Sequence, residues 1–191
     1  MRIKGGFCDV GKKMILHCAP TLAGLKTANM FNYKFSSIDT FLNELRDSND
    51  KLNRKGVYVE VLKIKENRAL VYVYRKERLE NDLKKPGVRE LLWQYGYQSC
   101  QWQHCREQLR KRLKEYDCFP HEIGVFLDYP LPDVIGFIEQ GGKNCKCCGV
   151  WKVYSNECET QQLFERYRKC TEVYQKVFAR GRTLVQLTVA A

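Results

Sequence analysis

Two neighbouring runs of β-branched and aromatic residues restrict the fold of this chain more than any other feature of its sequence. The runs VYVEVLKI and ALVYVYR begin at Val57 and Ala69, and the polar tetrapeptide KENR separates them. Such residues favour strands, and a short polar connection between two such runs is typical of a β-hairpin. The sequence therefore predicts a hairpin over residues 57–75.

Helical patterns precede and follow this hairpin. Proline suits the first turn of a helix, so Pro20 predicts a helix from that residue to about Phe31, and Pro86 predicts another over GVRELLWQY. The apolar spacing in SSIDTFLNEL predicts a helix that begins with a capping box of Ser36 and Asp39. A further amphipathic helix is indicated by one apolar stripe, which contains Trp102, Cys105, Leu109, Leu113 and Tyr116.

The C-terminal half alternates predicted strands with predicted helices. The strands are IGVFLDY, GVWKVY and LVQLTV, and the helices are LPDVIGFIEQGG and a segment from Leu163 to Phe178 that Gly181 ends. Interleaved strands and helices are typical of an α/β fold, here a mixed β-sheet in which the hairpin joins later strands and amphipathic helices pack against it. Because no repeat or linker-like run divides the chain, we expect a single domain over residues 1–191.

Apolar residues are too scattered along the chain for a membrane span. No stretch approaches the roughly 18 consecutive apolar residues that a span requires. The segment MILHCAPTLAGL is interrupted by His17 and preceded by Asp9, which excludes it as a secretory signal core. We therefore expect a cytoplasmic protein without membrane contact, whose ten cysteines are free thiols, metal ligands or redox groups.

Positive charge is concentrated in the central third of the chain. The formal net charge is +11, and fourteen Lys or Arg residues stand against six Asp or Glu between Lys63 and Lys114. Such a field attracts nucleic acid, an acidic protein or a phosphorylated ligand. Because no nucleic-acid motif is present, we favour an acidic partner such as a flavodoxin-like electron carrier and keep nucleic acid as the alternative. The candidate contact residues are Arg106, Arg110 and Lys111.

Four long segments together resemble a known family. They are HCAPTLAGLKTANMF, FPHEIGVFLDYPLPDVIGFI, GVWKVY and FERYRKCTEVYQKVF, they follow one another in one order, and the resemblance covers almost the whole chain. The chain resembles an uncharacterised family of bacterial proteins, found mainly in anaerobes and known only as a domain of unknown function. The resemblance implies one intact domain in a reducing, anaerobic cytosol, and it supplies no activity, cofactor or catalytic residue. The CKCC segment departs from the family pattern, where fewer cysteines are expected, which weakens any role that needs all three.

Cys18 and His121 form the first candidate catalytic site. Cys18 lies just before the first predicted helix, where the helix dipole favours the nucleophilic thiolate. His121 stands at the start of a predicted strand, and a thiol at a helix start that faces an imidazole on a strand is the arrangement of papain-like enzymes. The segment HEIGVFLDY also resembles the histidine-bearing strand of bacterial cell-wall cysteine peptidases.

In this reading Cys18 attacks the substrate and His121 acts as the base. Either Glu122 or Asp128 orients the imidazole, and His17 lies beside the thiol. The alternative is a buried Cys18 that packs as a small apolar side chain, with His121 capping a turn of the backbone.

Three cysteines in the glycine-rich segment GGKNCKCCG form a candidate metal site. Soft thiolates select zinc, copper(I) or iron–sulfur clusters, so Cys145, Cys147 and Cys148 are candidate ligands of zinc or an iron–sulfur cluster. The residues that would complete the set are His17, Cys18, Cys158 or Cys170. The spacing differs from that of a zinc ribbon, and free surface thiols are the alternative.

Lys152 is a candidate anion-binding or catalytic group. It lies between Trp151 and Val153 in a predicted strand, so its side chain is expected on the opposite face from theirs. The more ordinary alternative is an ammonium group that extends past apolar neighbours to water.

These patterns favour a thiol-dependent redox or metal-linked protein of anaerobic metabolism centred on Cys18. The first alternative is a hydrolase or transferase that uses Cys18 and His121. The second is a basic adaptor without catalytic activity that binds an acidic protein or nucleic acid.

Overall fold

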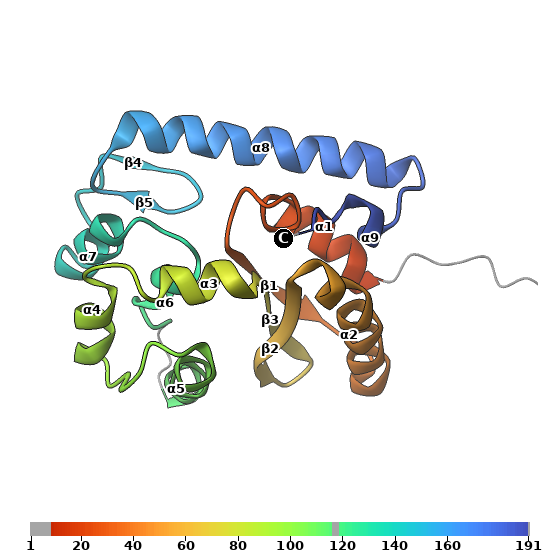
Figure 1. Cartoon of the computed structure of the whole chain (residues 1–191), viewed down its shortest axis with the longest axis horizontal. Coiled ribbons are helices and arrows are strands. Elements are labelled where there is room, and N and C mark those ends of the chain that lie inside the picture. Colours follow the sequence, from red (N-terminus) through yellow and green to blue (C-terminus); the bar gives the residue numbers. More distant parts are fainter. Residues whose placement is uncertain (1–8, 116–118, 191) are drawn as a thin grey trace, which may run out of the picture. The chain divides into compact units, whose positions relative to one another are not determined.

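The computed structural model describes residues 9–115 and 119–190, which form helices and antiparallel strands (Figure 1). The predicted mixed α/β class is confirmed. Contacts within the chain divide it into two compact units. Of the described residues, the first unit contains those up to Arg75 and those from Cys170 onward, and the second unit contains those between Lys76 and Lys169. Within the described residues, no helix is both long and apolar enough to cross a membrane.

The first unit is built on a three-stranded antiparallel sheet in the order β1-β3-β2. The strands β2 (Val57–Lys65) and β3 (Arg68–Arg75) form the predicted hairpin, with Glu66 at a φ of 54° in the connection. The third strand, β1 (Ala28–Lys34), precedes the hairpin in the chain and pairs with β3. We expected later strands in this place, but a strand from the N-terminal side fills it.

The helix α1 (Asp9–Leu22) ends where we expected a helix to begin. Pro20 lies inside α1, so the predicted helix from Pro20 to about Phe31 is wrong. A proline this close to the C-terminal end of a helix removes a single backbone hydrogen bond, which the helix tolerates here. In β1 the side chains of Phe31 and Tyr33 are buried while those of the residues between and after them are exposed, which is the period of two typical of a strand.

The helix α2 (Ile38–Leu52), which continues into the 3-10 helix η1 (Asn53–Lys55), confirms the helix predicted before the hairpin. Its N-cap is Ser37, whose Oγ accepts a hydrogen bond from the backbone N–H of Thr40 at 3.4 Å. The predicted capping box one residue earlier is therefore wrong. Either neighbouring serine has the chemistry of a cap, and the backbone makes Ser37 the capping residue by holding it in an extended conformation.

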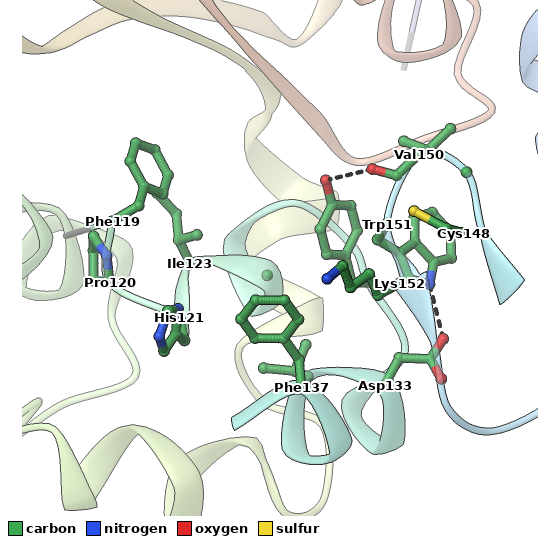
Figure 2. A pocket seen from close by; sticks show the side chains of 14 residues that line it. Phe119, Pro120, His121, Ile123, Asp133, Phe137, Cys148, Val150, Trp151 and Lys152 are labelled. Atoms are coloured by element: carbon green, nitrogen blue, oxygen red, sulfur yellow. Dashed lines mark hydrogen bonds between the residues drawn. The ribbon is translucent and has the colours of Figure 1, made fainter. Parts of the chain in front are cut away.

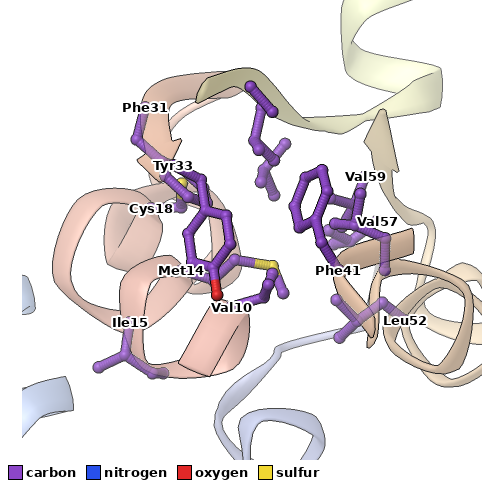
Figure 3. Close-up of a cluster of buried hydrophobic side chains, with 14 of the residues drawn as sticks. Val10, Met14, Ile15, Cys18, Phe31, Tyr33, Phe41, Leu52, Val57 and Val59 are labelled. Atoms are coloured by element: carbon purple, nitrogen blue, oxygen red, sulfur yellow. The ribbon is translucent and has the colours of Figure 1, made fainter. Parts of the chain in front are cut away.

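The core of the first unit lies between the sheet and the helices α1 and α2, as Figure 3 shows. Each fully buried aliphatic or aromatic side chain stabilises the fold by roughly 1.5–3 kcal/mol. The helical members of the core are Val10, Met14, Ile15, Cys18, Leu22, Phe41, Leu45 and Leu52, and the strand members include Phe31, Tyr33, Val57, Val59, Ala69, Val71 and Val73.

The end of the described chain is helical. The helix α8 (Glu157–Ala179) confirms the last predicted helix, and Gly181 follows it at a φ of 94°. The predicted strand LVQLTV is wrong, because Thr183 and Gln186 form a reciprocal capping box that begins the one-turn helix α9 (Leu184–Leu187). These local hydrogen bonds outweigh the β-branched pattern of the segment.

The second unit consists mainly of short helices. Its elements are α3 (Lys76–Asp82), α4 (Val88–Gln94), α5 (Trp102–Glu115), α6 (Ile123–Phe126), α7 (Leu131–Glu139), β4 (Cys147–Cys148), β5 (Lys152–Val153) and the first part of α8. The helices α4, α5 and α7 and the strand β5 confirm predicted elements. The predicted apolar stripe of α5 is buried over its described residues, and its last member, Tyr116, lies outside them.

The predicted strand IGVFLDY is wrong, because the segment forms α6 and a turn. Ile123, Val125 and Phe126 are all buried. A short, wholly apolar run does not distinguish a buried strand from a buried helix. The turn closes at Asp128, which has a φ of 61°, and the Tyr129 N–H donates to the Gly124 carbonyl at 3.0 Å.

Candidate functional site

A pocket of about 420 Å³ lies wholly within the second unit (Figure 2). The segment before α6, the helix α7 and the β4–β5 hairpin supply its walls. Most of the lining is apolar or aromatic, from Phe119, Pro120, Ile123, Gly124, Tyr129, Val134, Phe137, Gly149, Val150 and Trp151. The polar side chains on the wall are His121, Asp133, Cys148 and Lys152. Such a combination is typical of small-molecule sites.

Asp133 holds the hairpin against the first turn of α7. Its buried carboxylate accepts hydrogen bonds from Trp151 Nε1 at 2.8 Å, from the Tyr154 N–H at 2.8 Å, and from the N–H and hydroxyl of Ser155 at 2.7 and 2.8 Å. Burial alone would raise the pKa of this carboxyl, but the hydrogen bonds from Tyr154, Trp151 and Ser155 outweigh it and lower that pKa below its ordinary value. With four hydrogen bonds accepted, the carboxylate serves to fix the wall.

Trp151 forms an aromatic wall of the pocket. Its ring stacks on Tyr129 with centroids 4.6 Å apart and meets Phe164 edge-on at 4.6 Å. Burial raises the pKa of Tyr129 to about 12, so its hydroxyl stays protonated. The hydrogen bond from the indole N–H to Asp133 fixes the orientation of the Trp151 ring in this wall.

The register of the hairpin separates two adjacent cysteines. Cys147 pairs with Val153 and Cys148 pairs with Lys152, and successive side chains of a strand point to opposite faces. Cys147 packs against the buried cluster that contains Trp151 and Val153. Cys148 is exposed and lines the pocket with Lys152.

Lys152 and His121 stand on either side of Phe137 in the pocket (Figure 2). The Lys152 ammonium lies 5.9 Å from the ring centroid of Phe137 and donates to the Gly142 carbonyl at 2.6 Å. The imidazole of His121 meets the same ring edge-on at 5.0 Å. Among the described residues, no hydrogen bond to the His121 ring is found. The aromatic pocket therefore contains two basic side chains whose N–H groups can donate hydrogen bonds to a ligand.

Glu122 does not orient His121, contrary to one of the two predicted arrangements. Its fully buried carboxylate accepts hydrogen bonds from Arg112 Nε, from a second Arg112 nitrogen at 3.4 Å, and from the Tyr97 hydroxyl at 3.1 Å. Burial comes first among the causes that raise the pKa of Tyr97, and the Glu122 charge comes next. Glu122 thus ties the segment that carries His121 to α5.

Cys18 lies in the interior of α1, fully buried in the core of the first unit (Figure 3). Its predicted place just outside a helix N-terminus is therefore wrong. Burial raises the pKa of the Cys18 thiol far above its ordinary value, and the Lys26 charge offsets only part of that rise. The neighbouring His17 is exposed and stacks on Phe31 at 5.5 Å. Cys18 belongs to the first unit and His121 to the second, so neither unit contains both members of the predicted pair.

The predicted metal ligands are not gathered into a binding set. Over residues 9–115 and 119–190, no group of three or more His, Cys, Asp or Glu side chains is placed to hold a metal ion. Cys145 and Cys147 are half-buried while Cys148 is exposed. The opposite orientation of Cys147 and Cys148 in the hairpin is the physical reason that the three thiols do not converge.

A family model described as "Protein of unknown function (DUF3793)" matches residues 14–188 of the chain. The chain belongs to the DUF3793 family. This match confirms the resemblance to a domain of unknown function, and it spans every residue of the pocket. No curated protein and no solved structure matches the chain.

The predicted basic surface of this DUF3793 chain is narrower than the sequence indicates. Of the candidate contact residues on α5, Lys111 is exposed and lies 3.8 Å from Glu115, while Arg106 and Arg110 are half-buried. The side chain of Arg112 is directed to Glu122. Part of the positive charge on α5 therefore forms an ion pair inside the second unit and does not face a partner.

Sequence reasoning on this DUF3793 chain found His121, Cys148 and Lys152, but it missed that they line one pocket. It also missed Asp133 and the aromatic wall of Trp151. An acidic residue in the first turn of a helix ordinarily interacts with the helix dipole, so Asp133 gave no sign of its bonds to a hairpin 18 residues later. The alternation of Trp151 and Lys152 in GVWKVY was the one available signal.

Proposed function

We propose that this DUF3793 chain binds a small organic anion with a flat, apolar body in the pocket of the second unit. The observation that carries the proposal is the pairing of Lys152 and His121, two basic groups, with the aromatic surface of Phe137 inside one cavity. The volume of about 420 Å³ is within the range of small-molecule sites.

The charges in the pocket favour an anion over a cation. Asp133, the acidic residue of the lining, already accepts four hydrogen bonds and so offers little to a ligand. Lys152 gives one hydrogen bond to Gly142, and an ammonium group has three N–H donors. A carboxylate or sulfonate next to Lys152 would form a charge-assisted hydrogen bond at the edge of an apolar site.

The aromatic lining favours a flat ligand body. The rings of Tyr129, Trp151 and Phe137 line the cavity, and Tyr129 and Trp151 stack on each other. Burial of an apolar ligand surface supplies the larger part of the binding free energy, while the basic groups select the charge and orientation.

The functions predicted from the sequence stay predictions. A redox or metal-linked role centred on Cys18 gains no support from the structure, because this thiol is fully buried. The hypothesis of a hydrolase or transferase depends on the same buried thiol and gains no support either. An acidic protein partner, or nucleic acid, rests on the net charge of +11. The pocket supports ligand binding more directly than it supports any of these.

The test is a fluorescence titration with two dyes of similar shape. Anilinonaphthalenesulfonate is an aromatic anion, and N-phenylnaphthylamine is its neutral counterpart. We expect saturable binding of the anion, and Lys152→Gln weakens it about tenfold, because hydrogen bonds to charged groups are worth about 1.5–3 kcal/mol. The neutral dye binds both proteins alike.

Lys143→Gln is the matched control, because Lys143 is exposed in the connection between α7 and β4, next to Gly142, and is absent from the pocket lining. It removes the same charge and leaves binding of the anion nearly unchanged. If the anion does not bind, or if the two lysine variants weaken it equally, the proposed function is wrong.

A further inference from the structure

Cys148 and Lys152 stand directly opposite each other in the β4–β5 hairpin. Residues opposed in an antiparallel pair lie on the same face, with Cβ atoms about 4.5–5.5 Å apart. Both side chains line the pocket, and Cys148 is also exposed to solvent (Figure 2). Cys148 and Lys152 are therefore neighbouring residues on one wall of a cavity that a small molecule can enter, and the Lys152 ammonium reaches the Gly142 carbonyl beside Phe137.

The neighbouring thiol has a different environment. Cys147 is half-buried, and it packs with Leu163 and Phe164 against the cluster of Trp151 and Val153. Of the two adjacent cysteines, only Cys148 is presented to the pocket.

We propose that Cys148 is a site of mixed-disulfide formation with small anionic disulfides that the pocket binds, an inference that rests on the proposed function. The Cys148 thiolate, after loss of its proton to solvent, attacks one sulfur of the bound disulfide. The S–S bond of the ligand breaks, a new S–S bond forms to Cys148 Sγ, and the other half of the ligand leaves as a thiolate. Cys148 is oxidised, and the released half is reduced.

Lys152 selects the charge of the disulfide. When its ammonium group holds a carboxylate of the ligand, the disulfide sulfurs are kept near Cys148 Sγ across the hairpin, and attack becomes effectively intramolecular. A neutral disulfide lacks this anchor and gains only from the apolar walls.

The experiment measures thiol exchange on the folded full chain under anaerobic conditions. Dithiobis(nitrobenzoate) is an aromatic disulfide that carries carboxylates, and dithiodipyridine is a neutral aromatic disulfide. The release of each coloured thiol gives the rate, and peptide mass spectrometry identifies the modified cysteine. We expect the anionic probe to modify Cys148 first, and Cys148→Ser to remove the fast phase.

Cys158 is the internal control for exposure, because it is an exposed thiol of α8 outside the pocket. We expect its modification by the anionic probe to be about tenfold slower than that of Cys148, the factor that one hydrogen bond to a charged group supplies. Lys152→Gln slows the anionic probe at Cys148 by a similar factor and leaves the neutral probe unchanged, whereas Lys143→Gln changes neither rate. Equal rates at Cys148 and Cys158, or equal slowing of both probes by Lys152→Gln, would overturn the inference.

Binding of anilinonaphthalenesulfonate to Cys148→Ser separates this inference from the proposed function. If the dye binds this variant and the wild-type chain equally but Cys148 exchanges no faster than Cys158, then the pocket binds anions and the thiol inference alone is wrong. If the dye binds neither protein, the proposed function is wrong, and the thiol inference loses the anion binding on which it rests. In the expected case, the dye also protects Cys148 of the wild-type chain from the anionic probe.

Discussion

Asp133 combines a buried charge with four hydrogen bonds, and its two oxygens have different tasks. One oxygen accepts the Trp151 indole N–H, and the other accepts three donors from Tyr154 and Ser155. Asp133→Asn replaces one acceptor oxygen with an amide donor, which leaves a donor facing a donor. We expect the free energy of unfolding to fall by about 1–3 kcal/mol, as measured by urea denaturation, and the anionic dye to bind more weakly. Unchanged stability would mean that these hydrogen bonds do not hold the hairpin.

The pKa of Asp133 also predicts how stability depends on pH. Its pKa in the folded chain lies below the ordinary value of 3.8, so the unfolded chain binds the proton more readily. The stabilisation is therefore present above that ordinary value and is lost as the pH falls through the lower folded pKa. We expect the stability difference between wild type and Asp133→Asn to shrink on acidification below about pH 4. Urea titrations of both proteins over this range give the difference, and parallel curves would contradict the assignment.

Cys18 and Cys158 offer a direct comparison between a core thiol and a surface thiol. Cys18 is fully buried and burial raises its pKa, whereas Cys158 is exposed. We expect iodoacetamide to label Cys158 in the native chain and Cys18 only after unfolding. Cys18→Ser buries a hydroxyl and lowers the free energy of unfolding by about 1–3 kcal/mol, while Cys158→Ser changes it little. Equally rapid native labelling of the two residues would restore Cys18 as a reactive thiol.

Residue types alone pointed to part of the candidate site. The reactive or charged groups of His121, Cys148 and Lys152 are evident from their residue types, and all three side chains line one pocket. No sequence pattern indicated the role of Asp133, because that role depends on which hydrogen-bond donors the fold brings to its carboxylate. It also misjudged Cys18, because the environment of a thiol is set by packing and not by the proline that follows two residues later.

At the scale of elements, the ion pair between Arg112 and Glu122 joins α5 to the segment that carries His121. The Glu122 side chain is completely buried, so loss of its partner would leave an uncompensated charge. We expect Arg112→Met to lower the free energy of unfolding by about 3–5 kcal/mol.

Lys111→Met is the matched control for this pair, on the same helix. Lys111 lies 3.8 Å from Glu115, and both side chains are more than half exposed. Exposed pairs of this kind contribute about 0–1 kcal/mol, so this substitution has little effect on the urea midpoint. Equal losses in the two variants would show that α5 is not held by the buried pair.

The elements that the sequence predicted well are those with a repeated pattern. The hairpin of β2 and β3 and the helices α2, α5 and α8 each repeat their period several times. The errors fall on short segments, where one local interaction decides the conformation. The capping box of Thr183 at α9 and the turn at Asp128 after α6 are interactions of this kind. Pro20 misled in a different way, because proline is typical of the first turn of a helix, whereas here it lies inside α1 close to its C-terminal end.

At the scale of the whole molecule, the order of residues along the sequence does not reveal the two compact units. The first unit takes residues from both ends of the described chain, and the second is contributed by Lys76–Lys169 between them. The chain passes from the first unit to the second directly between β3 and α3, and it returns to the first unit inside α8. Neither position has the Pro, Gly and Ser composition of a linker, and the single domain expected over residues 1–191 stays a prediction.

The net charge of +11 also acts on any anion that approaches the pocket, beyond the local effect of Lys152. A field from many exposed charges is screened over about 10 Å at 0.1 M salt, whereas a contact inside a pocket is screened much less. We expect added potassium chloride to weaken binding of the anionic dye several-fold and to leave the neutral dye unaffected. The residual anion binding at high salt should still depend on Lys152, because Lys152→Gln removes a contact whereas Lys143→Gln removes only one exposed charge. Titrations of the wild type and both variants at low and high salt measure the two contributions separately. If the two lysine variants become indistinguishable at high salt, the net field and not the pocket attracts the anion.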